Sequence, residues 1–265
     1  MVTAGLGSYK WQLAGRRLAR QANRSHLFST VEAYDLVSLR RYIPEFYDEH
    51  GQFISENARG YGYWLWRPYL LLKKIKSLKE DEMIVFLDAG CELNINFESE
   101  RRFLDYVKIA KDSGICIMRT SYLLTSWCKQ DTLNSLSIRS DSSIRTVEPG
   151  VLFLTKSDVN TELMEQWIYW STKSNYHHLD DSPSKAPNGL NFVEHRHDQS
   201  LLTALLADRP DSTIEQESFF PDDSWRTAGA NFPIWVTRNH HPFLHESGHS
   251  TSVIYRSLRK VLRGH

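Results

Sequence analysis

The sequence predicts an α/β fold in which a mixed, mostly parallel sheet is flanked by helices. Short apolar runs alternate with amphipathic segments along the chain, and this alternation favours strands connected by helices. No internal repeat and no linker interrupts the 265 residues, a length that suits one large domain. We therefore expect a single domain over residues 1–265.

The elements follow from hydrophobic spacing. A first helix is predicted at 11–24, with an inward face of Leu13, Ala14, Leu18 and Ala22. Its arginines are placed mostly on the outer face: Arg16, Arg17, Arg20 and Arg24. Strands are predicted at 27–34, 83–87, 114–118 and 150–154. Further helices are predicted at 69–78, 101–111, 162–172 and 198–207.

Polar and serine-rich composition marks two further segments, 129–146 and 173–191, as loops. Long polar loops in a compact domain are usually disordered or act as functional lids. We expect both loops to be more mobile than the sheet and to become ordered over a ligand.

Composition excludes several classes of protein. Lysine plus arginine and aspartate plus glutamate balance at 32 each, so bulk charge gives no indication of a nucleic-acid partner. The three cysteines show no CxxC spacing, which favours a reducing compartment over a disulfide framework or a zinc site. No apolar run approaches the roughly 18 residues of a membrane span. A cytoplasmic protein is expected.

The strand predicted at 83–87 ends in Asp88-Ala89-Gly90. In open α/β sheets, ligands bind beyond the carboxyl ends of the strands, which places this carboxylate where a ligand would lie. The same tripeptide is also acceptable turn chemistry, and that simpler interpretation stays open. An aspartyl-phosphatase site is excluded, because such a site needs a second aspartate at position 90.

Upstream, the stretch RGYGYWLWRP at 59–68 is unusually aromatic, and glycines interrupt it. Such density is untypical of a core strand, and aromatic rings can bind flat ligands and sugars. Arg67 stands directly before Pro68, which suits the first turn of the next helix.

Four blocks in the same order resemble a group of glycosyltransferases that build bacterial polysaccharides. The group carries GYGYWxWKP, a strand ending in DAG, an EAG strand and an HDQS helix start. Here these blocks read GYGYWLWRP, DAG, EPGVLFL from residue 148 and HDQS from residue 197. Residues 3–22 resemble the group's first strand and nucleotide-side loop. Arg67 replaces the usual lysine, and Pro149 the usual alanine.

The resemblance implies a GT-A type, Rossmann-like fold, with a nucleotide-sugar-binding half at about 1–95 and an acceptor half at about 96–265. The implied function is nucleotide-sugar-dependent transfer, with retention, from a UDP- or GDP-sugar to a saccharide or lipid-linked saccharide in glycan biosynthesis. The rival is a catalytically silent sugar- or nucleotide-binding protein on the same fold.

The resemblance also assigns roles to residues. Catalytic roles fall to Asp198 and Gln199, although aspartate is also a favoured helix N-cap. Donor binding is assigned to Gly5, Gly7, Trp64, Trp66, Arg67, Asp88, Ala89 and Gly90. Acceptor binding is assigned to Glu148, Gly150, His195 and His197.

A divalent cation, Mn²⁺ or Mg²⁺, would be held by Asp88 together with His240 or His241. The DAG tripeptide lacks the second carboxylate of the DxD motif of GT-A enzymes, which leaves the metal requirement open. The basic segment 255–265 predicts a short helix that is either a solvated surface element or a peripheral contact with the inner face of the membrane.

Overall fold

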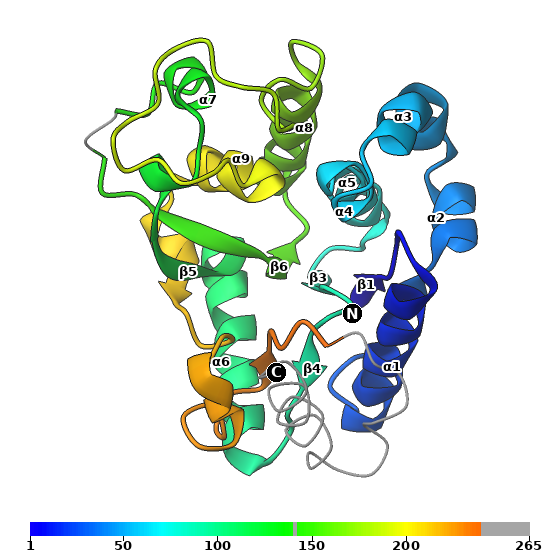
Figure 1. The fold of residues 1–265 in the computed structure, drawn as a ribbon. Coiled ribbons are helices and arrows are strands. Elements are labelled where there is room, and N and C mark those ends of the chain that lie inside the picture. Colours follow the sequence, from blue (N-terminus) through cyan, green and yellow to red (C-terminus); the bar gives the residue numbers. More distant parts are fainter. Residues whose placement is uncertain (140–141, 240–265) are drawn as a thin grey trace, which may run out of the picture.

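The computed structural model describes residues 1–139 and 142–239, and a six-stranded sheet in the order β2-β1-β3-β6-β5-β7 forms the centre of this part (Figure 1). Parallel pairs are β1–β2, β1–β3 and β5–β7, whereas β6 runs antiparallel to both β3 and β5. These strands are β1 Val2–Ala4, β2 Glu32–Tyr34, β3 Met83–Leu87, β5 Ile115–Leu123, β6 Arg145–Thr155 and β7 Thr213–Glu215. A separate ladder pairs β4 Glu92–Leu93 with β8 Ile234–Trp235.

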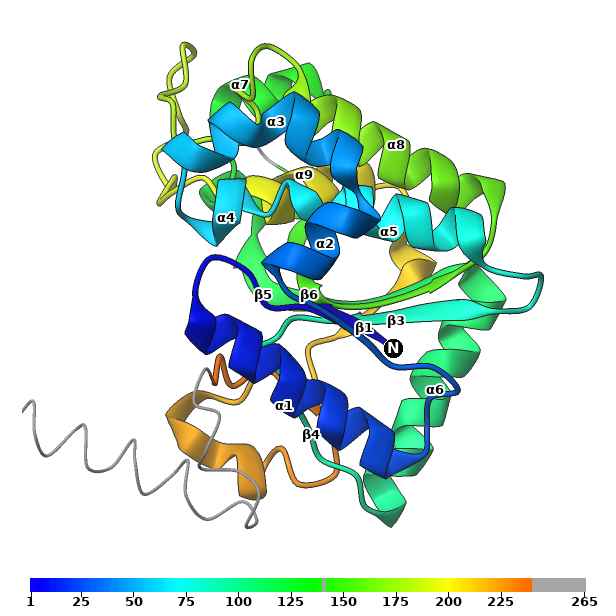
Figure 2. The same ribbon diagram turned by 90° about the vertical axis from the view of Figure 1, so that its right-hand side faces the viewer.

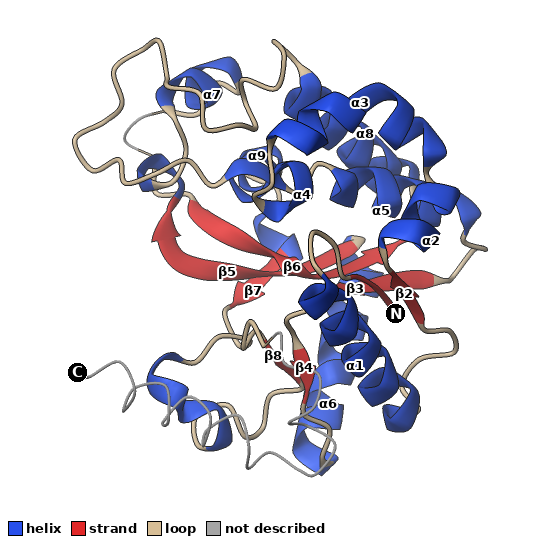
Figure 3. Ribbon diagram, turned by 45° about the vertical axis from the view of Figure 1, so that its right-hand side comes forward, coloured by secondary structure: helices blue, strands red, loops and turns tan. Residues whose placement is uncertain are grey.

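Helices cover both faces of the sheet (Figures 2 and 3). The α-helices are α1 Tyr9–Ser25, α2 Leu36–Tyr42, α3 Pro44–Glu56, α4 Gly60–Tyr63, α5 Trp66–Ser77, α6 Phe97–Ser113, α7 Gln130–Ser135, α8 Asp158–Thr172 and α9 His197–Leu205. Short 3₁₀ turns lie at Leu124–Ser126, Pro210–Ser212 and Pro221–Arg226. Helices α1 and α6 lie on one side of the sheet, and α5, α8 and α9 on the other (Figure 2). The predicted fold class, a mixed and mostly parallel sheet flanked by helices, is confirmed.

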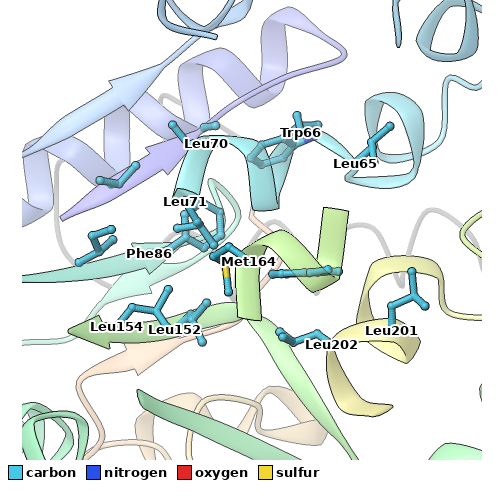
Figure 4. Packing of buried hydrophobic residues seen from close by; sticks show 14 of the residues in the cluster. Leu65, Trp66, Leu70, Leu71, Phe86, Leu152, Leu154, Met164, Leu201 and Leu202 are labelled. Atoms are coloured by element: carbon cyan, nitrogen blue, oxygen red, sulfur yellow. The ribbon is translucent and has the colours of Figure 1, made fainter. Parts of the chain in front are cut away.

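Two apolar cores follow from the period-two alternation of the strands. On β6, Leu152 and Leu154 join the core beneath α5, α8 and α9 (Figure 4), while Val151 and Phe153 join the core beneath α1 and α6. Both faces of this part of the strand are therefore buried, which explains the continuous apolar run Val151–Leu154. Each fully buried large side chain contributes roughly 1.5–3 kcal/mol through the hydrophobic effect.

Several sequence expectations need correction. The strand predicted at 27–34 is formed only at Glu32–Tyr34. The predicted loop 129–146 contains α7 and the start of β6, because buried Thr132 and Leu133 anchor a helical turn that the polar composition conceals. Helices α2 and α3 were not predicted, although Asp35 and Ser38 form a capping box at the start of α2.

The two polar segments also hold each other in place. The buried ammonium of Lys129 donates to the carbonyl oxygens of Asp180 and Ser182. Asp131 accepts hydrogen bonds from the backbone amides of Lys185 and Ala186 at 2.7 and 2.9 Å. These bonds give the segment 180–186 a defined path over α7.

The topology brings three strand ends to one edge. Strands β1 and β3 are parallel, so their carboxyl ends point the same way. Strand β6 is antiparallel to β3, with Leu87 opposite Val151, so the residues of β6 that precede Val151 run past the end of β3. None of the helices in 1–139 and 142–239 combines the length and apolar character needed to cross a bilayer.

Candidate functional site

A pocket of about 790 Å³ opens at this edge of the sheet. Its walls come from segments around Gly7, Trp64, Asp88, Glu148, Asp198 and Arg238, which are far apart in the sequence. Pockets of this size bind cofactors and other small molecules. The four sequence blocks singled out above and the loop after β1 thus meet in one cavity.

Asp88 follows β3 directly, and its backbone makes a turn. Its N–H donates to the Gly150 carbonyl at 2.9 Å, and its own carbonyl accepts from the Cys91 N–H at 2.8 Å. The Asp88 carboxylate remains about one-third exposed in the pocket and accepts a 2.7 Å hydrogen bond from Nη2 of Arg67. Asp88 is therefore both a turn residue and a pocket residue.

Arg67 lies at the centre of the polar site and is 2% exposed. Its Nη2 contacts Asp88, and its Nη1 contacts the carboxylate of Asp198. The guanidinium also lies 5.4 Å from the ring centre of Phe86. Burial alone would lower the pKa of Arg67, but the two carboxylates outweigh burial and raise it. Arg67 joins the end of β3 to the start of α9.

Asp198 is the second residue of α9 and is 4% exposed. The alternative interpretation of Asp198 as the helix N-cap is wrong, because the cap position belongs to Arg196. Burial raises the pKa of Asp198 to about 7; contact with Arg67 opposes this rise, and neighbouring Asp88 adds to it. The adjacent Gln199 is held by a 2.8 Å bond from its Nε2 to the Val147 carbonyl.

Glu148 supplies a third carboxylate from β6. Its Oε1 accepts from the Gly150 N–H at 3.3 Å, and it forms no ion pair with any residue of 1–139 and 142–239. Burial and the charge of Asp88 raise the pKa of Glu148. A Cβ at Gly150 would lie 2.6 Å from Asp88 Oδ2 and 3.0 Å from Glu148 Oε1. Glycine therefore keeps open a space onto which two carboxylates converge.

The donor set can be tested against a divalent cation. Asp88 and Glu148 offer carboxylate oxygens around the open space at Gly150, while Asp198 is engaged by Arg67. Within residues 1–139 and 142–239, no group of three or more histidine, cysteine, aspartate or glutamate side chains could hold a metal. This set fits Mg²⁺, or the similar Mn²⁺, held by one or two carboxylates and completed by substrate phosphates and water. The proposed ligands His240 and His241, and the basic segment 255–265, lie outside the described residues.

The aromatic wall rests on an unusual backbone. Residues 60–64 all have positive φ, and the two glycines of GYGYW adopt this conformation without steric cost. The Trp64 ring packs against Gly60, where a Cβ would lie 2.4 Å from ring atoms. Left-handed non-glycine residues cost about 1–3 kcal/mol each and cluster at functional sites. The alternation of glycine and aromatic residues therefore serves to turn Tyr61 and Trp64 into the pocket.

The other predicted donor residues divide into two sets. Gly7 and Trp66 line the pocket, as does Ser8 at the start of α1. Gly5 does not; it lets α1 approach β1, because a Cβ there would lie 2.0 Å from the Trp11 carbonyl oxygen. The amino end of α1 has no capping side chain, and the positive end of the helix dipole there suits an anion.

The two predicted acceptor histidines also differ. His197 lines the pocket and stacks on Tyr63, with 4.4 Å between ring centres. His195 does not reach the pocket; it is buried, its Nδ1 accepts from the Lys129 N–H, and its Nε2 lies 2.9 Å from the His178 carbonyl oxygen. The structure thus gives His195 a role in holding the segment before α9.

Sequence reasoning missed Arg17, which was expected on the outer face of α1. It is 2% exposed and donates to the carbonyls of Ala89, Cys91 and Asn239. These bonds fix the turn that carries Asp88. The available signal was its position, three residues after Ala14 and directly before Leu18, both of which are fully buried.

Fold and site together define an α/β protein with a ligand-sized pocket beyond the carboxyl ends of β1 and β3, lined by aromatic rings, carboxylates and arginines. No family model matches the chain, and no curated protein matches it in sequence. The structure is similar to the apo crystal structure of mouse xyloside xylosyltransferase 1, with a TM-score of 0.44 and 13% identity, over 88% of this chain and 95% of that one.

Proposed function

We propose that the protein is a nucleotide-sugar-dependent glycosyltransferase of GT-A type. One observation carries this proposal: the blocks around Trp64, Asp88, Glu148 and Asp198, which resemble glycosyltransferase motifs, line a single pocket at the carboxyl edge of the sheet. The sheet topology brings the end of β3 beside β6, and the turn at residues 60–64 and the start of α9 add the other two blocks to the same pocket.

The donor diphosphate needs positive partners. Arg67 is already committed to two carboxylates, so it serves to position them rather than to bind phosphate. Arg238 and the amino end of α1 line the same pocket and are the better anion ligands. A divalent cation at Asp88 and Glu148 would supply charge neutralisation of the leaving diphosphate. The donor is a UDP- or GDP-sugar in this proposal.

Transfer is proposed to proceed with retention, as the resemblance around Asp198 and Gln199 implies. Buried Asp198, held by Arg67, would stabilise positive charge at the sugar without itself leaving its place. With Glu148 assigned to the cation, the acceptor hydroxyl would give its proton to the leaving diphosphate oxygen, so this reaction needs no separate protein base. The acceptor is a saccharide or a lipid-linked saccharide.

One observation favours the rival, a binding protein without turnover. Asp88 and Asp198 are both tied to Arg67, which leaves few charged groups free for chemistry. Such a protein would bind the donor and leave it intact.

Thermal unfolding with a panel of UDP-, GDP- and dTDP-sugars, with and without Mn²⁺, tests the proposal. A donor at a hundred times its Kd should add about 2.7 kcal/mol of stability. Asp88→Asn should abolish this gain while the protein stays folded. Asp112→Asn, an exposed position on α6, serves as the control. A panel without any stabilising nucleotide sugar would contradict both the enzyme and the silent binder.

Turnover separates the two functions. Asp198→Asn keeps the shape of the side chain and should lower transfer or donor hydrolysis at least about a hundredfold, the low end for a positioned catalytic group. Donor binding without any hydrolysis or transfer by the wild type would favour the silent binder.

A further inference from the structure

Beside the pocket, two segments leave apolar side chains in solvent. We call the exposed residues Tyr122, Leu123, Leu190 and Val193, together with the half-buried Trp127, the rim strip. Leu190 is fully exposed, Val193 is 62% exposed, and Tyr122 and Leu123 are each more than 40% exposed. The two segments lie side by side, because the Val193 N–H donates to the Ser126 carbonyl at 2.8 Å.

The rim strip is held in place by hydrogen bonds. The Arg196 N–H donates to the Trp127 carbonyl at 3.0 Å, and the hydroxyl of Ser200 on α9 donates to the same oxygen. The backbone around Trp127 is thus fixed to the helix that carries Asp198. Val193, whose backbone is bonded to Ser126, is therefore exposed on an ordered surface.

The rim strip is continuous with the pocket through Arg196. The Arg196 guanidinium lies 3.9 Å from the ring centre of Trp127 and 5.7 Å from that of Tyr122. Arg196 and Glu194 also line the pocket. A ligand that leaves the pocket on this side therefore passes from charged groups onto an aromatic and aliphatic surface.

We propose that the rim strip is a subsite for the apolar aglycone of an amphipathic glycoside acceptor. The proposal rests on the proposed transferase function, whose acceptor sugar would occupy the polar pocket. Exposed apolar patches with polar surroundings mark binding sites. Only a ligand with a polar head and an apolar tail matches both surfaces at once.

Local charge favours such a ligand over a membrane surface. Peripheral binding to anionic membranes uses clusters of unpaired lysine and arginine. Here Arg196 pairs with Glu194, and both Arg119 and Arg145 pair with Glu215. These three arginines thus share two glutamates and leave a net charge of only one, and none of the three is unpaired, which suits an individual neutral tail better than an anionic membrane.

The test measures binding of methyl, hexyl and octyl β-glucosides, below their micelle concentrations, by NMR titration without any donor. Each methylene fully buried should tighten binding about fourfold, so octyl glucoside should bind at least about tenfold more tightly than methyl glucoside. The variant Leu190→Ser/Val193→Ser should remove this dependence on chain length. Val37→Ser is a matched control, because Val37 on α2 is also 62% exposed.

Equal binding of methyl and octyl glucosides would overturn the proposal. An equal loss of the chain-length dependence in the rim variant and in Val37→Ser would also overturn it. Binding of the wild type to vesicles of neutral and anionic phospholipid, lost in the rim variant, would assign the surface to membranes instead. Because no donor is present, failure of the nucleotide-sugar panel would leave a positive result here intact and would refute only the transferase.

Discussion

Two buried cations of this protein, Arg67 in the pocket and Lys129 under the segment 180–186, have the same exposure and different surroundings. The side chain of each is 2% exposed. Arg67 contacts two carboxylates and lies near a third, Glu148. Lys129 contacts one carboxylate, Asp180, and otherwise neutral oxygens of Asp180 and Ser182.

The two clusters differ in charge balance. Around Lys129, one positive charge meets one negative charge, and hydrogen bonds to neutral oxygens satisfy the rest of the ammonium group. Around Arg67, three carboxylates lie near one guanidinium; burial raises the pKa of Asp198 and of Glu148, and the negative charge of Asp88 adds to both rises. Such an unbalanced cluster costs stability unless a positive ligand completes it, and a cation or a developing oxocarbenium charge would do so.

The largest expected effect concerns Arg67 itself. Arg67→Met leaves two carboxylates in the site without their cation and should cost about 3–5 kcal/mol of unfolding free energy, as measured in urea. Arg67→Lys keeps the positive charge but cannot bridge both carboxylates as a planar fork. It should therefore lose less unfolding free energy than Arg67→Met. Lys129→Met is the comparison variant for unfolding free energy, because the Lys129 side chain is as deeply buried as that of Arg67. A loss below about 1 kcal/mol in Arg67→Met would show that the bridge contributes little to stability.

A second prediction uses the opposite pH dependences of the two regions. The pKa of Asp198 is raised in the folded state to about 7, so between an unfolded value of about 3.9 and pH 7 the folded protein binds more protons. Wild-type stability should therefore fall relative to Asp198→Asn as pH rises through this window, by at most about 1.4 kcal/mol per pH unit. If unfolding free energy changed with pH in the same way in the wild type and in Asp198→Asn, the pKa of Asp198 would not be raised in the folded protein.

The smallest effect is expected at Asp131. Backbone hydrogen bonds from Lys185 and Ala186 lower the pKa of Asp131 against the effect of burial, and the nearby His177 also contributes. A depressed pKa stabilises the fold above about pH 3.9 and ceases to do so as pH falls through the folded value. The advantage of wild type over Asp131→Asn, about 1 kcal/mol near neutral pH, should shrink on acidification.

Amide hydrogen exchange at Lys185 and Ala186 reports this region directly, because both amides donate to Asp131. Faster exchange of these two amides in Asp131→Asn, with unchanged exchange in β3, is the expected pattern. Equal protection in the variant and the wild type would mean that other contacts hold the segment. The same experiment with a bound donor tests whether the two polar segments become ordered over a ligand.

Local pattern was enough to place much of the framework. The apolar run at 83–87 and the helical spacing at 69–78 and 198–207 predicted β3, α5 (Trp66–Ser77) and α9 (His197–Leu205), because each element buries a face whose period is set by its own backbone. The position of Asp88 at a strand end followed in the same way. The aromatic stretch 59–67 was recognised as untypical of a core strand, and the structure shows that its glycines allow a left-handed turn.

The partners of these residues were decided only by tertiary structure. Arg67 and Asp198 are 131 residues apart, and Arg17 and Asn239 are 222 apart, so no local spacing indicates either contact. Pairing of β6 between β3 and β5 sets which carboxylates meet, and the same packing leaves Gly7 and His197 in the pocket but moves Gly5 and His195 away from it. The sequence by itself determined which segments carry polar groups at strand and helix ends. Which of these groups neutralise one another depends on distances between elements, and packing of the whole chain sets those distances.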